Sequence, residues 1–338
     1  MLVDNIHSTA GNHNAGDVHF GRDGYLYVTV GDGGCDYAGD SGCGGANDAA
    51  RDRHVLLGKV LRVTRDGDIP AGNPFRGPGT ARCNVTGSTT PGNTCQETFA
   101  WGLRNPFRFA FDPGSVATRF LVNDVGQGAW EEVDLGEAGV DYGWNCREGD
   151  NANPQAGASC AGFPPASPPA SPYRPPVYEY GRGTGCGSIT GGAFVPRGAF
   201  STEYDGHYLL ADFNCGKVLR LASVPAADNT AVELASNLGP VVHLRFGPAG
   251  SGQALYYTTY NYPGQGSQIR RIRYTGSASR APVAAVTAQP SSGAPPLLVT
   301  LDGSGSNDPD GNLPLRYLWS FGDGSADAET TTATTTPT

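Results

Sequence analysis

A strand-turn-strand phrase recurs along this chain, and it constrains the possible fold more than any other feature of the sequence. The phrase reads VHFGRDGYLYVTVGDG over residues 18–33, FAFDPGSVATRFLVNDVG over 109–126 and LRFGPAGSGQALYYTT over 244–259. Each copy has an apolar strand, a polar or glycine-rich turn and a second, alternating strand. A looser copy occupies residues 192–212. Such repeats at uneven spacings, with variable loops between them, predict the blades of a β-propeller that carries insertions.

The composition also favours an all-β protein. The 338 residues include 50 glycines and 26 prolines, and aromatic and β-branched runs recur between them. This combination is typical of many short strands joined by tight turns. No long amphipathic helical pattern stands out. No stretch approaches the roughly 18 apolar residues of a membrane helix, so we expect no membrane span.

The charge of the chain bears on its partners. The formal net charge is −9, and positive charge comes almost entirely from arginine, with Lys59 and Lys217 as the lysines. Proteins that bind nucleic acid usually carry a basic footprint, so we expect no nucleic-acid partner. An acidic chain can instead favour the binding of cations.

Eight cysteines are spread through turn-rich sequence, at positions Cys35, Cys43, Cys83, Cys95, Cys146, Cys160, Cys186 and Cys215. None belongs to the C-x-x-C pair of a zinc or thioredoxin-like site, so the even number predicts disulfides. Sequential pairing closes the shortest loops, although the sequence leaves the connectivity open. Disulfides predict a secreted, extracellular or periplasmic protein, and the alternative is a cytosolic protein with buried free thiols. Residues 1–5 do not resemble a signal peptide, so we expect a leader to lie outside this chain.

A series of short phrases resembles the glucose/sorbosone dehydrogenase family, in the order that the family has them. They are HNAG (13–16), DGYLYV (23–28) with GDGG (31–34), LGKVLR (57–62), GLRNP (102–106), DVGQ (124–127) with WEEV (130–133), YGW (142–144) and ITGG (189–192). The resemblance covers about residues 11–276. It implies a six-bladed β-propeller, which in the best-known members uses pyrroloquinoline quinone (PQQ) and calcium. The resemblance begins at a point that follows the first blades of the family's propeller. We therefore expect the N-terminal blades to be missing from this chain.

Residues 282–324 resemble the first half of a PKD domain, an immunoglobulin-like β-sandwich. The phrases VTLDGSGS (299–306), DPDG (308–311) and YLWSFGDG (317–324) carry this resemblance. The closing strands are not evident, and the tail SADAETTTATTTPT has the low complexity of a disordered segment. The sequence therefore predicts a partial propeller over 1–276, a linker over 277–281, a partial PKD-like module over 282–324 and a low-complexity tail over 325–338.

The resemblance assigns catalytic and cofactor residues. Oxidation of a sugar hydroxyl needs a base for the O–H proton, and a neutral imidazole is the usual base. His13 matches the catalytic histidine of the family, and Asp32 matches the carboxylate that orients it. Arg104 and Asn105 match the pair that contacts the quinone, and Trp144 could stack on a ring. The alternative is a structural role for these residues in turns or, for Trp144, in the core.

The resemblance also implies a calcium site. Gly126 and Gln127 match positions whose backbone carbonyls hold calcium in the family, and Glu131 or Glu132 would add a carboxylate. Glycine permits the backbone turn that this carbonyl ligation requires.

The sequence departs from the quinone-binding members of the family in two places. Phe107 stands where they have a glutamine, and residues 240–242 (PVV) lack their basic pair. A tricarboxylate cofactor needs cationic partners. The sequence offers four arginines as replacements and places none of them: Arg108, Arg147, Arg182 and Arg197.

Nicotinamide, P-loop, serine hydrolase and zinc protease motifs are missing from the sequence. The first interpretation is a secreted PQQ- and calcium-dependent oxidoreductase that oxidises the CH–OH group of an aldose or related sugar. The alternative is a non-catalytic calcium-binding propeller that binds a glycan or protein partner, like the hedgehog-interacting relatives of the family. The PKD-like module would attach the protein to a polysaccharide or a cell-surface partner. The sequence does not identify the sugar.

Overall fold

The computed structural model of the chain describes residues 1–6, 11–34, 49–156, 160–163, 172–226, 229–250, 252–262, 264, 266–274, 282–294, 296–309, 315–321 and 327–336. Within these ranges the regular structure is β-strand, apart from the short 3-10 helices η2 (Arg182–Thr184) and η3 (Thr202–Tyr204). The predicted all-β class is therefore confirmed. None of the helices in the described ranges is long and apolar enough to cross a membrane.

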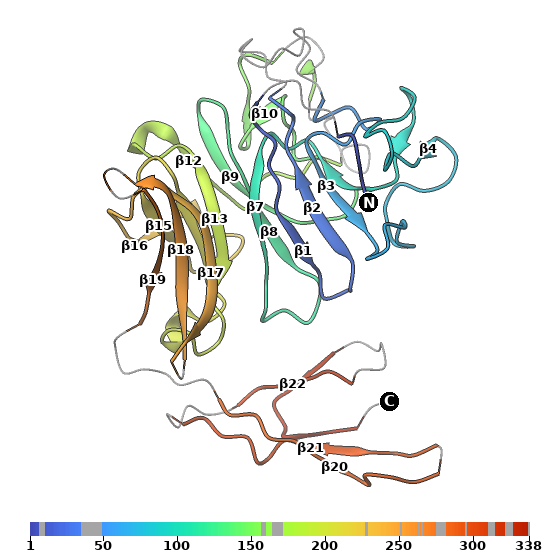
Figure 1. Cartoon of the computed structure of the whole chain (residues 1–338), viewed down its shortest axis with the longest axis vertical. Helices are drawn as coiled ribbons and strands as arrows, with labels where there is room; N and C mark the ends of the chain where they lie inside the picture. The colour runs from blue at the N-terminus through green and yellow to red at the C-terminus, as the bar shows by residue number, and fades with distance from the viewer. Residues whose placement is uncertain are drawn as a thin grey trace.

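Four antiparallel sheets of three or four strands form the blades of the propeller (Figure 1). The first blade contains β1 (Val18–Phe20), β2 (Leu26–Val30), β3 (Lys59–Val63) and β6 (Thr98–Trp101). The second contains β7 (Pro106–Phe111), β8 (Phe120–Asp124), β9 (Trp130–Leu135) and β12 (Tyr178–Gly181). The third contains β13 (Ile189–Phe194), β14 (Tyr208–Asp212), β15 (Lys217–Leu221) and β16 (Val232–Ala235). The fourth contains β17 (Val241–Ala249), β18 (Gly252–Tyr262) and β19 (Gly266–Ile272).

The recurring phrase of the sequence forms the first hairpin of each blade. β1 pairs with β2, β7 with β8, β13 with β14 and β17 with β18, all antiparallel. β13 packs between β7 and β17, and β2 packs against β7, so the blades lie side by side in chain order (Figure 1). The interpretation of the repeats as propeller blades is confirmed.

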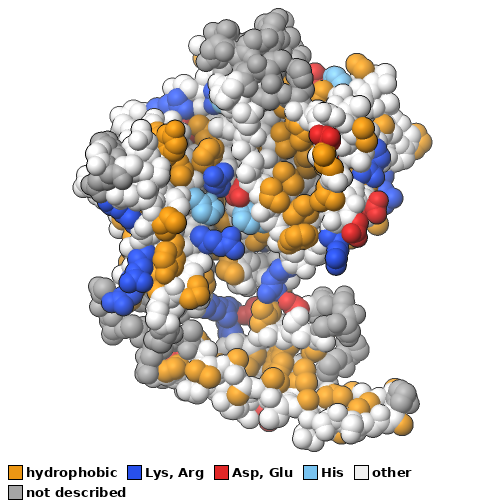
Figure 2. Space-filling model, in the orientation of Figure 1, with side chains coloured by type: hydrophobic (Ala, Val, Ile, Leu, Met, Phe, Trp, Pro, Cys, Tyr) orange, Lys and Arg blue, Asp and Glu red, His pale blue; other side chains and the backbone are white. Residues whose placement is uncertain are grey.

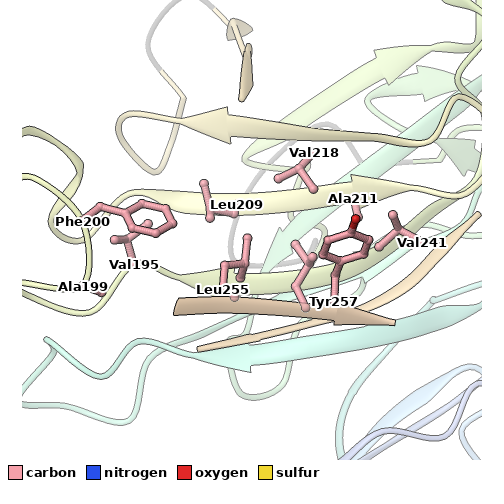
Figure 3. Packing of buried hydrophobic residues seen from close by; sticks show 11 residues of the cluster. Val195, Ala199, Phe200, Leu209, Ala211, Val218, Val241, Leu255 and Tyr257 are labelled. Atoms are coloured by element: carbon pink, nitrogen blue, oxygen red, sulfur yellow. The ribbon is translucent and has the colours of Figure 1, made fainter. Parts of the chain in front are cut away.

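Apolar cores fill the space between successive blades. In β8, Phe120 and Val122 join the core shared with the first blade, whereas Leu121 joins the core shared with the third. This division follows from the strand geometry, because successive side chains point to opposite faces of a sheet. Between the third and fourth blades, Leu209 packs in one cluster with Leu255 (Figure 3). Burial on both faces explains the consecutive apolar residues Phe120–Val122 in β8 and Tyr208–Ala211 in β14.

Four blades lie in the described ranges, whereas the resemblance implies six. Apolar side chains are exposed on the first and last of these blades, with Phe20 on β1 59% exposed and Ile269 on β19 78% exposed. Histidine and arginine side chains gather near the centre of the face shown in Figure 2. A hollow of about 330 Å³ is lined by His19, His243 and Arg245 together with apolar residues.

Disulfides join cysteines that are neighbours in the sequence. The described pairs are Cys83–Cys95, Cys146–Cys160 and Cys186–Cys215. Sequential pairing is confirmed for these six residues, while Cys35 and Cys43 lie outside the described residues. The first bridge staples the insertion that carries β4 (Thr80–Ala81) and β5 (Thr94–Cys95). The second staples the insertion with β10 (Arg147–Glu148) and β11 (Asn151–Ala152), and such bridges are consistent with an extracellular or periplasmic location.

The C-terminal module has two small sheets. One contains β20 (Thr287–Gln289), β21 (Thr300–Asp302) and β24 (Thr334–Thr335), and the other contains β22 (Tyr317–Trp319) and β23 (Ala328–Thr330). Trp319 is buried and donates a hydrogen bond from Nε1 to Thr330 Oγ1 over 3.0 Å. The tail therefore differs from the expectation of a disordered segment without closing strands. Threonine is β-branched and favours strands, so a tail of low complexity can still complete a sheet.

Candidate functional site

His13 and Asp32 lie together beside the end of β2. The distance between His13 Nδ1 and Asp32 Oδ1 is 2.9 Å, and the Asp32 side chain is fully buried. Asp32 also accepts hydrogen bonds from the backbone N–H of Gly34 on Oδ1 and from Trp144 Nε1 on Oδ2, each over 2.9 Å. These bonds hold the carboxylate in one orientation. They leave His13 as the member of the pair with an exposed edge, since its side chain is 10% exposed.

The GDGG turn explains why the sequence positions this pair. A Cβ on Gly31 would lie 1.9 Å from the carbonyl oxygen of His13, so only glycine permits the close approach of the two backbones. Gly33 and Gly34 have φ of +75° and +72°, in the left-handed region that favours glycine. Asp32 N–H donates to the carbonyl oxygen of Arg104 over 2.8 Å, which ties the turn to the second blade.

The geometry assigns the two ring nitrogens of His13 to different tasks. Nδ1 faces a carboxylate, which accepts hydrogen bonds, so the neutral ring carries its proton on Nδ1. The lone pair is then on Nε2, which is the atom that can accept a proton. The arrangement has the base and orienter logic of a general base catalyst.

Arg104 and Asn105 form the turn that leads into β7. Their backbone N–H groups donate to the two carboxylate oxygens of Asp124, over 2.8 and 2.6 Å. The guanidinium carbon of Arg104 lies 5.4 Å from the ring centroid of Trp144, and Nη1 donates to the carbonyl oxygen of Gly126 over 2.8 Å. Burial raises the pKa of Asp124 to about 7, and the two amide bonds oppose that rise. The side-chain oxygen of Asn105 is buried and has no hydrogen-bond donor among the described residues.

The loop between β8 and β9 is held by charges of both signs. Arg182 donates to the carbonyl oxygens of Gly126 and Gln127, each over 2.6 Å, and its Nε donates to Glu131 Oε1 over 2.9 Å. The amide groups of the loop point the other way. Glu148 Oε1 accepts from the N–H groups of residues 127–130, over 2.6, 2.7, 2.9 and 3.2 Å. Burial raises the pKa of Glu131 to about 7, and the Arg182 charge lowers it.

This arrangement bears on the predicted calcium ligands. The carbonyl oxygens of Gly126 and Gln127 accept hydrogen bonds from guanidinium groups, so they do not fit a calcium ion in this arrangement of side chains. Glu131 and Glu132 are successive residues of β9 and point to opposite faces of the sheet. Glu131 pairs with Arg182, whereas Glu132 lies close to Asp124. Ligation by Gly126, Gln127 and Glu131 stays a prediction that this geometry does not favour.

The structure brings several predicted residues together and adds others. His13, Asp32, Trp144 and Arg104 are joined by the contacts described above. Trp144 is 2% exposed, so it forms a wall of the site, with its N–H on Asp32. The sequence did not identify Glu148 or the Trp144 bond to Asp32, and it offered no signal for either. Both contacts join residues that are distant in the sequence, so only the tertiary structure brings them together.

The four arginines considered as cationic partners have different surroundings. Arg182 lies at the site, whereas Arg197 pairs with Glu329 of the C-terminal module over 3.4 Å. Arg147 donates to the carbonyl oxygen of Asp150, and Arg108 stacks over the ring of Phe107 at 4.4 Å. Phe107 itself packs against the core between the second and third blades. A partly buried aromatic side chain thus stands where the quinone-binding members have the glutamine.

The family model for glucose/sorbosone dehydrogenase matches residues 1–266, and a PKD domain model matches residues 279–337. The chain belongs to the glucose/sorbosone dehydrogenase family. It is 32% identical to the HIPL1 protein of Arabidopsis thaliana over 248 residues, which are 65% of this chain and 31% of that protein. It is 29% identical over 136 residues to the aldose sugar dehydrogenase YliI of Escherichia coli, across 40% of this chain and 30% of that protein.

Solved structures of the family share the fold. The PQQ-bound aldose sugar dehydrogenase from Streptomyces coelicolor superposes with a TM-score of 0.53 at 25% identity, over 78% of this chain and 63% of that one. The apo-form of the soluble E. coli aldose sugar dehydrogenase superposes with a TM-score of 0.54 at 20% identity, over 80% and 67%. The chain thus spans 31% of HIPL1 and 63% of the Streptomyces structure.

Proposed function

We propose that this chain carries the active site of an exported oxidoreductase that oxidises the CH–OH group of an aldose or related sugar with PQQ as cofactor. The observation that supports this most is the buried chain of contacts from His13 through Asp32 to Trp144, with Arg104 beside the indole. A histidine held by a fully buried carboxylate, next to a cationic group, matches what the removal of a hydroxyl proton requires.

The residues present fit an anionic, planar cofactor. Arg104 brings a positive charge to the loop between β8 and β9, and the second guanidinium there, that of Arg182, is paired with Glu131. Asn105 adds a buried amide oxygen without a hydrogen-bond donor among the described residues, which is open to a donor from a ligand. Charge-assisted bonds from guanidinium groups are well suited to carboxylates, and PQQ carries three of these groups.

The mechanism follows from the roles of these side chains. PQQ, when bound, supplies the acceptor for the two electrons that leave the sugar. His13 Nε2 accepts the proton of the sugar hydroxyl, because Nδ1 is held by Asp32. Asp32 stabilises the imidazolium that forms, and Trp144 holds Asp32 and excludes water from its second oxygen. Arg104 would hold an anionic group of the cofactor through its guanidinium.

The C-terminal module supports a proposal about partners. A PKD-like sandwich joined to an exported sugar enzyme would attach it to a polysaccharide or a cell-surface partner. Salt bridges from Arg22 to Asp327 over 2.6 Å and from Arg197 to Glu329 over 3.4 Å link the module to the blades. The module would therefore hold the blades near the surface that it binds.

The test of the enzyme proposal is reduction of an electron-acceptor dye with aldoses by the protein loaded with PQQ. We expect His13→Ala to lower turnover by about 10²–10⁴-fold, the usual contribution of a general acid-base group. Asp32→Asn should also impair turnover, because the ring loses the partner that fixes its tautomer. His207→Ala, a partly buried histidine of the third blade, is the matched control and should keep full turnover. Equal turnover in His13→Ala and His207→Ala would refute the assignment.

A second candidate function is a non-catalytic propeller that binds a glycan or protein partner. Phe107, packed against the core, and the guanidinium groups on the loop carbonyls favour it, because both depart from the quinone-binding pattern. Titration of the protein with PQQ separates the two candidates. No PQQ binding and no dye reduction with any aldose, together with retained glycan binding, would leave the second candidate in place.

A further inference from the structure

The hollow of about 330 Å³ lies among the first strands of all four blades. Its lining includes His19 of β1, Phe109 of β7, Phe194 of β13 and Leu244 of β17. Each of these strands is the edge strand of its sheet. The blades of a β-propeller surround a central channel, so a hollow shared by the four edge strands lies where such a channel runs.

This hollow is separate from the candidate active site. Asn105 directly precedes β7, whereas Phe111, which lines the hollow, is the last residue of that strand. Phe194 is likewise the last residue of β13. Neither His13 nor Arg104 lines the hollow. A molecule bound here would therefore occupy a second site.

Apolar and aromatic side chains form most of the wall of the hollow. Phe109, Phe194 and Leu244 are buried, and Phe20 is exposed. The ring of His19 meets Phe109 edge to face, with ring centroids 4.9 Å apart. Binding sites for small molecules are mostly apolar hollows of about 300–1,000 Å³ with a few polar groups. The size and the wall of this hollow match that class.

The ionisable groups of the hollow are basic. His19, His243 and Arg245 line it, and no described aspartate or glutamate does. This contrasts with the whole chain, which has 32 acidic residues and 23 lysines and arginines. Nδ1 of His243 is buried and has no hydrogen-bond partner among the residues that the structure describes. Asp17 lies nearby, with Oδ1 3.2 Å from Nε2 of His19, so His19 already has an acidic partner.

We propose that this hollow binds a small organic anion, with its apolar body between the phenylalanine rings and its carboxylate at His243 and Arg245. These two residues are two positions apart on β17, so their side chains point to the same face. A guanidinium forms charge-assisted hydrogen bonds with a carboxylate, and the imidazole adds a second donor. Burial of the apolar body provides the remaining stabilisation.

The protonation of His243 gives the proposal a second signature. Burial lowers the pKa of His243 below its ordinary value of 6.5. The Asp17 charge opposes that shift, and three neighbours add to it, namely Arg108, His19 and Arg245. A carboxylate beside the ring favours the imidazolium, so binding raises this pKa and takes up a proton. The affinity for the anion should therefore increase as the pH falls from 8 to 6.

The experiment is a calorimetric titration of the full chain with sodium phenylacetate and, separately, with phenylacetamide. The two compounds share the ring and the size, and they differ in charge. We expect phenylacetate to bind with a Kd on the order of 1 mM, as suits a ligand of about ten heavy atoms. Phenylacetamide should bind at least about tenfold more weakly, because hydrogen bonds to a charged group contribute more than those to a neutral one.

Variants place the ligand in the hollow. Arg245→Gln should weaken phenylacetate binding by about tenfold, and His243→Leu should weaken it and remove the pH dependence. Arg65→Gln is the control and should bind as wild type, because the Arg65 side chain is 82% exposed and does not line the hollow. The histidine NMR signal that is missing in His243→Leu belongs to His243, and phenylacetate should shift it in the wild-type protein.

Circular dichroism verifies that each variant is folded. If His243→Leu does not fold, Arg245→Gln carries the test, since its side chain is exposed. Absence of saturable phenylacetate binding overturns the proposal. Equal binding of phenylacetamide overturns it as well, as does unchanged phenylacetate binding in Arg245→Gln. None of these measurements uses sugar, PQQ or dye, so failure of the proposed catalytic function would leave this result standing.

Discussion

Removal of the Arg182 side chain is the sharpest test of the loop between β8 and β9. Its guanidinium pairs with Glu131, which is fully buried, and bonds two backbone carbonyls. Arg182→Ala therefore leaves a buried carboxylate without its cation and two carbonyl oxygens without their donor. Removing one partner of a buried ion pair lowers the free energy of unfolding by about 3–5 kcal/mol. Because the Arg182 side chain is 28% exposed, water can partly replace it, and we expect Arg182→Ala to lower the free energy of unfolding by about 2–3 kcal/mol near pH 8.

The cost should depend on pH in a defined direction. Burial raises the folded pKa of Glu131 to about 7, above its ordinary value of 4.5. The folded state then binds more protons than the unfolded state between these values, so stability falls as pH rises through this window. Arg182 lowers that pKa, and its removal extends the window upward. Near pH 5 Glu131 is largely protonated in the folded state of both proteins, and the difference should shrink to about 1 kcal/mol, the worth of the lost hydrogen bonds.

Urea unfolding of wild type and Arg182→Ala across this pH range measures the difference. The control is Arg174→Ala, whose pair with Glu137 has a distance of 2.8 Å but side chains that are 51% and 36% exposed. Exposed pairs contribute about 0–1 kcal/mol, so this variant should change little at any pH. A cost for Arg182→Ala below that of the control near pH 8, or one that does not vary with pH, would refute the reasoning.

Two further predictions test the turn and the disulfides. Gly31→Ala places a Cβ 1.9 Å from the carbonyl oxygen of His13, so it should displace the histidine and abolish dye reduction, whereas Gly11→Ala, with no atom within 4 Å, should not. Replacement of Cys83 and Cys95 by serine opens a loop with a sequence separation of 12 and should cost about 3 kcal/mol in thermal unfolding, from the chain entropy of the unfolded state; an unchanged melting temperature would contradict it.

Much of the fold could be predicted because strand periodicity and turn residues are local signals. The hairpins over 18–33 and 244–259 are examples, since alternation and glycine turns depend on neighbours in the chain. The strands of the tail were not predicted. β24 pairs with β21, which lies far earlier in the sequence, whereas β23 pairs with the neighbouring β22. Threonine repeats look the same in a disordered tail and in an edge strand, so the sequence did not mark either strand.

The candidate site was predictable to a different extent. His13 and Asp32 belong to phrases whose glycines are required by close backbone approach, so the sequence marks them. No pattern in the sequence around Arg182 indicates its role, because that role depends on carbonyl oxygens of residues more than 50 positions earlier. A sequence pattern can identify a loop that offers carbonyls. It cannot show that an arginine from the same chain occupies them.

The alternation of β9 connects the two charged regions of the second blade. Glu131 faces Arg182 and the loop carbonyls, while Glu132, one residue on, faces Asp124 and Asp134. One strand therefore supports the loop from one face and the Arg104 turn from the other. In this structure Arg182 holds the carbonyls of the loop and Glu148 holds its amides. The carboxylates of Glu132 and Asp134 lack such compensation, since Oε2 of Glu132 and both oxygens of Asp134 have no hydrogen-bond donor among the described residues.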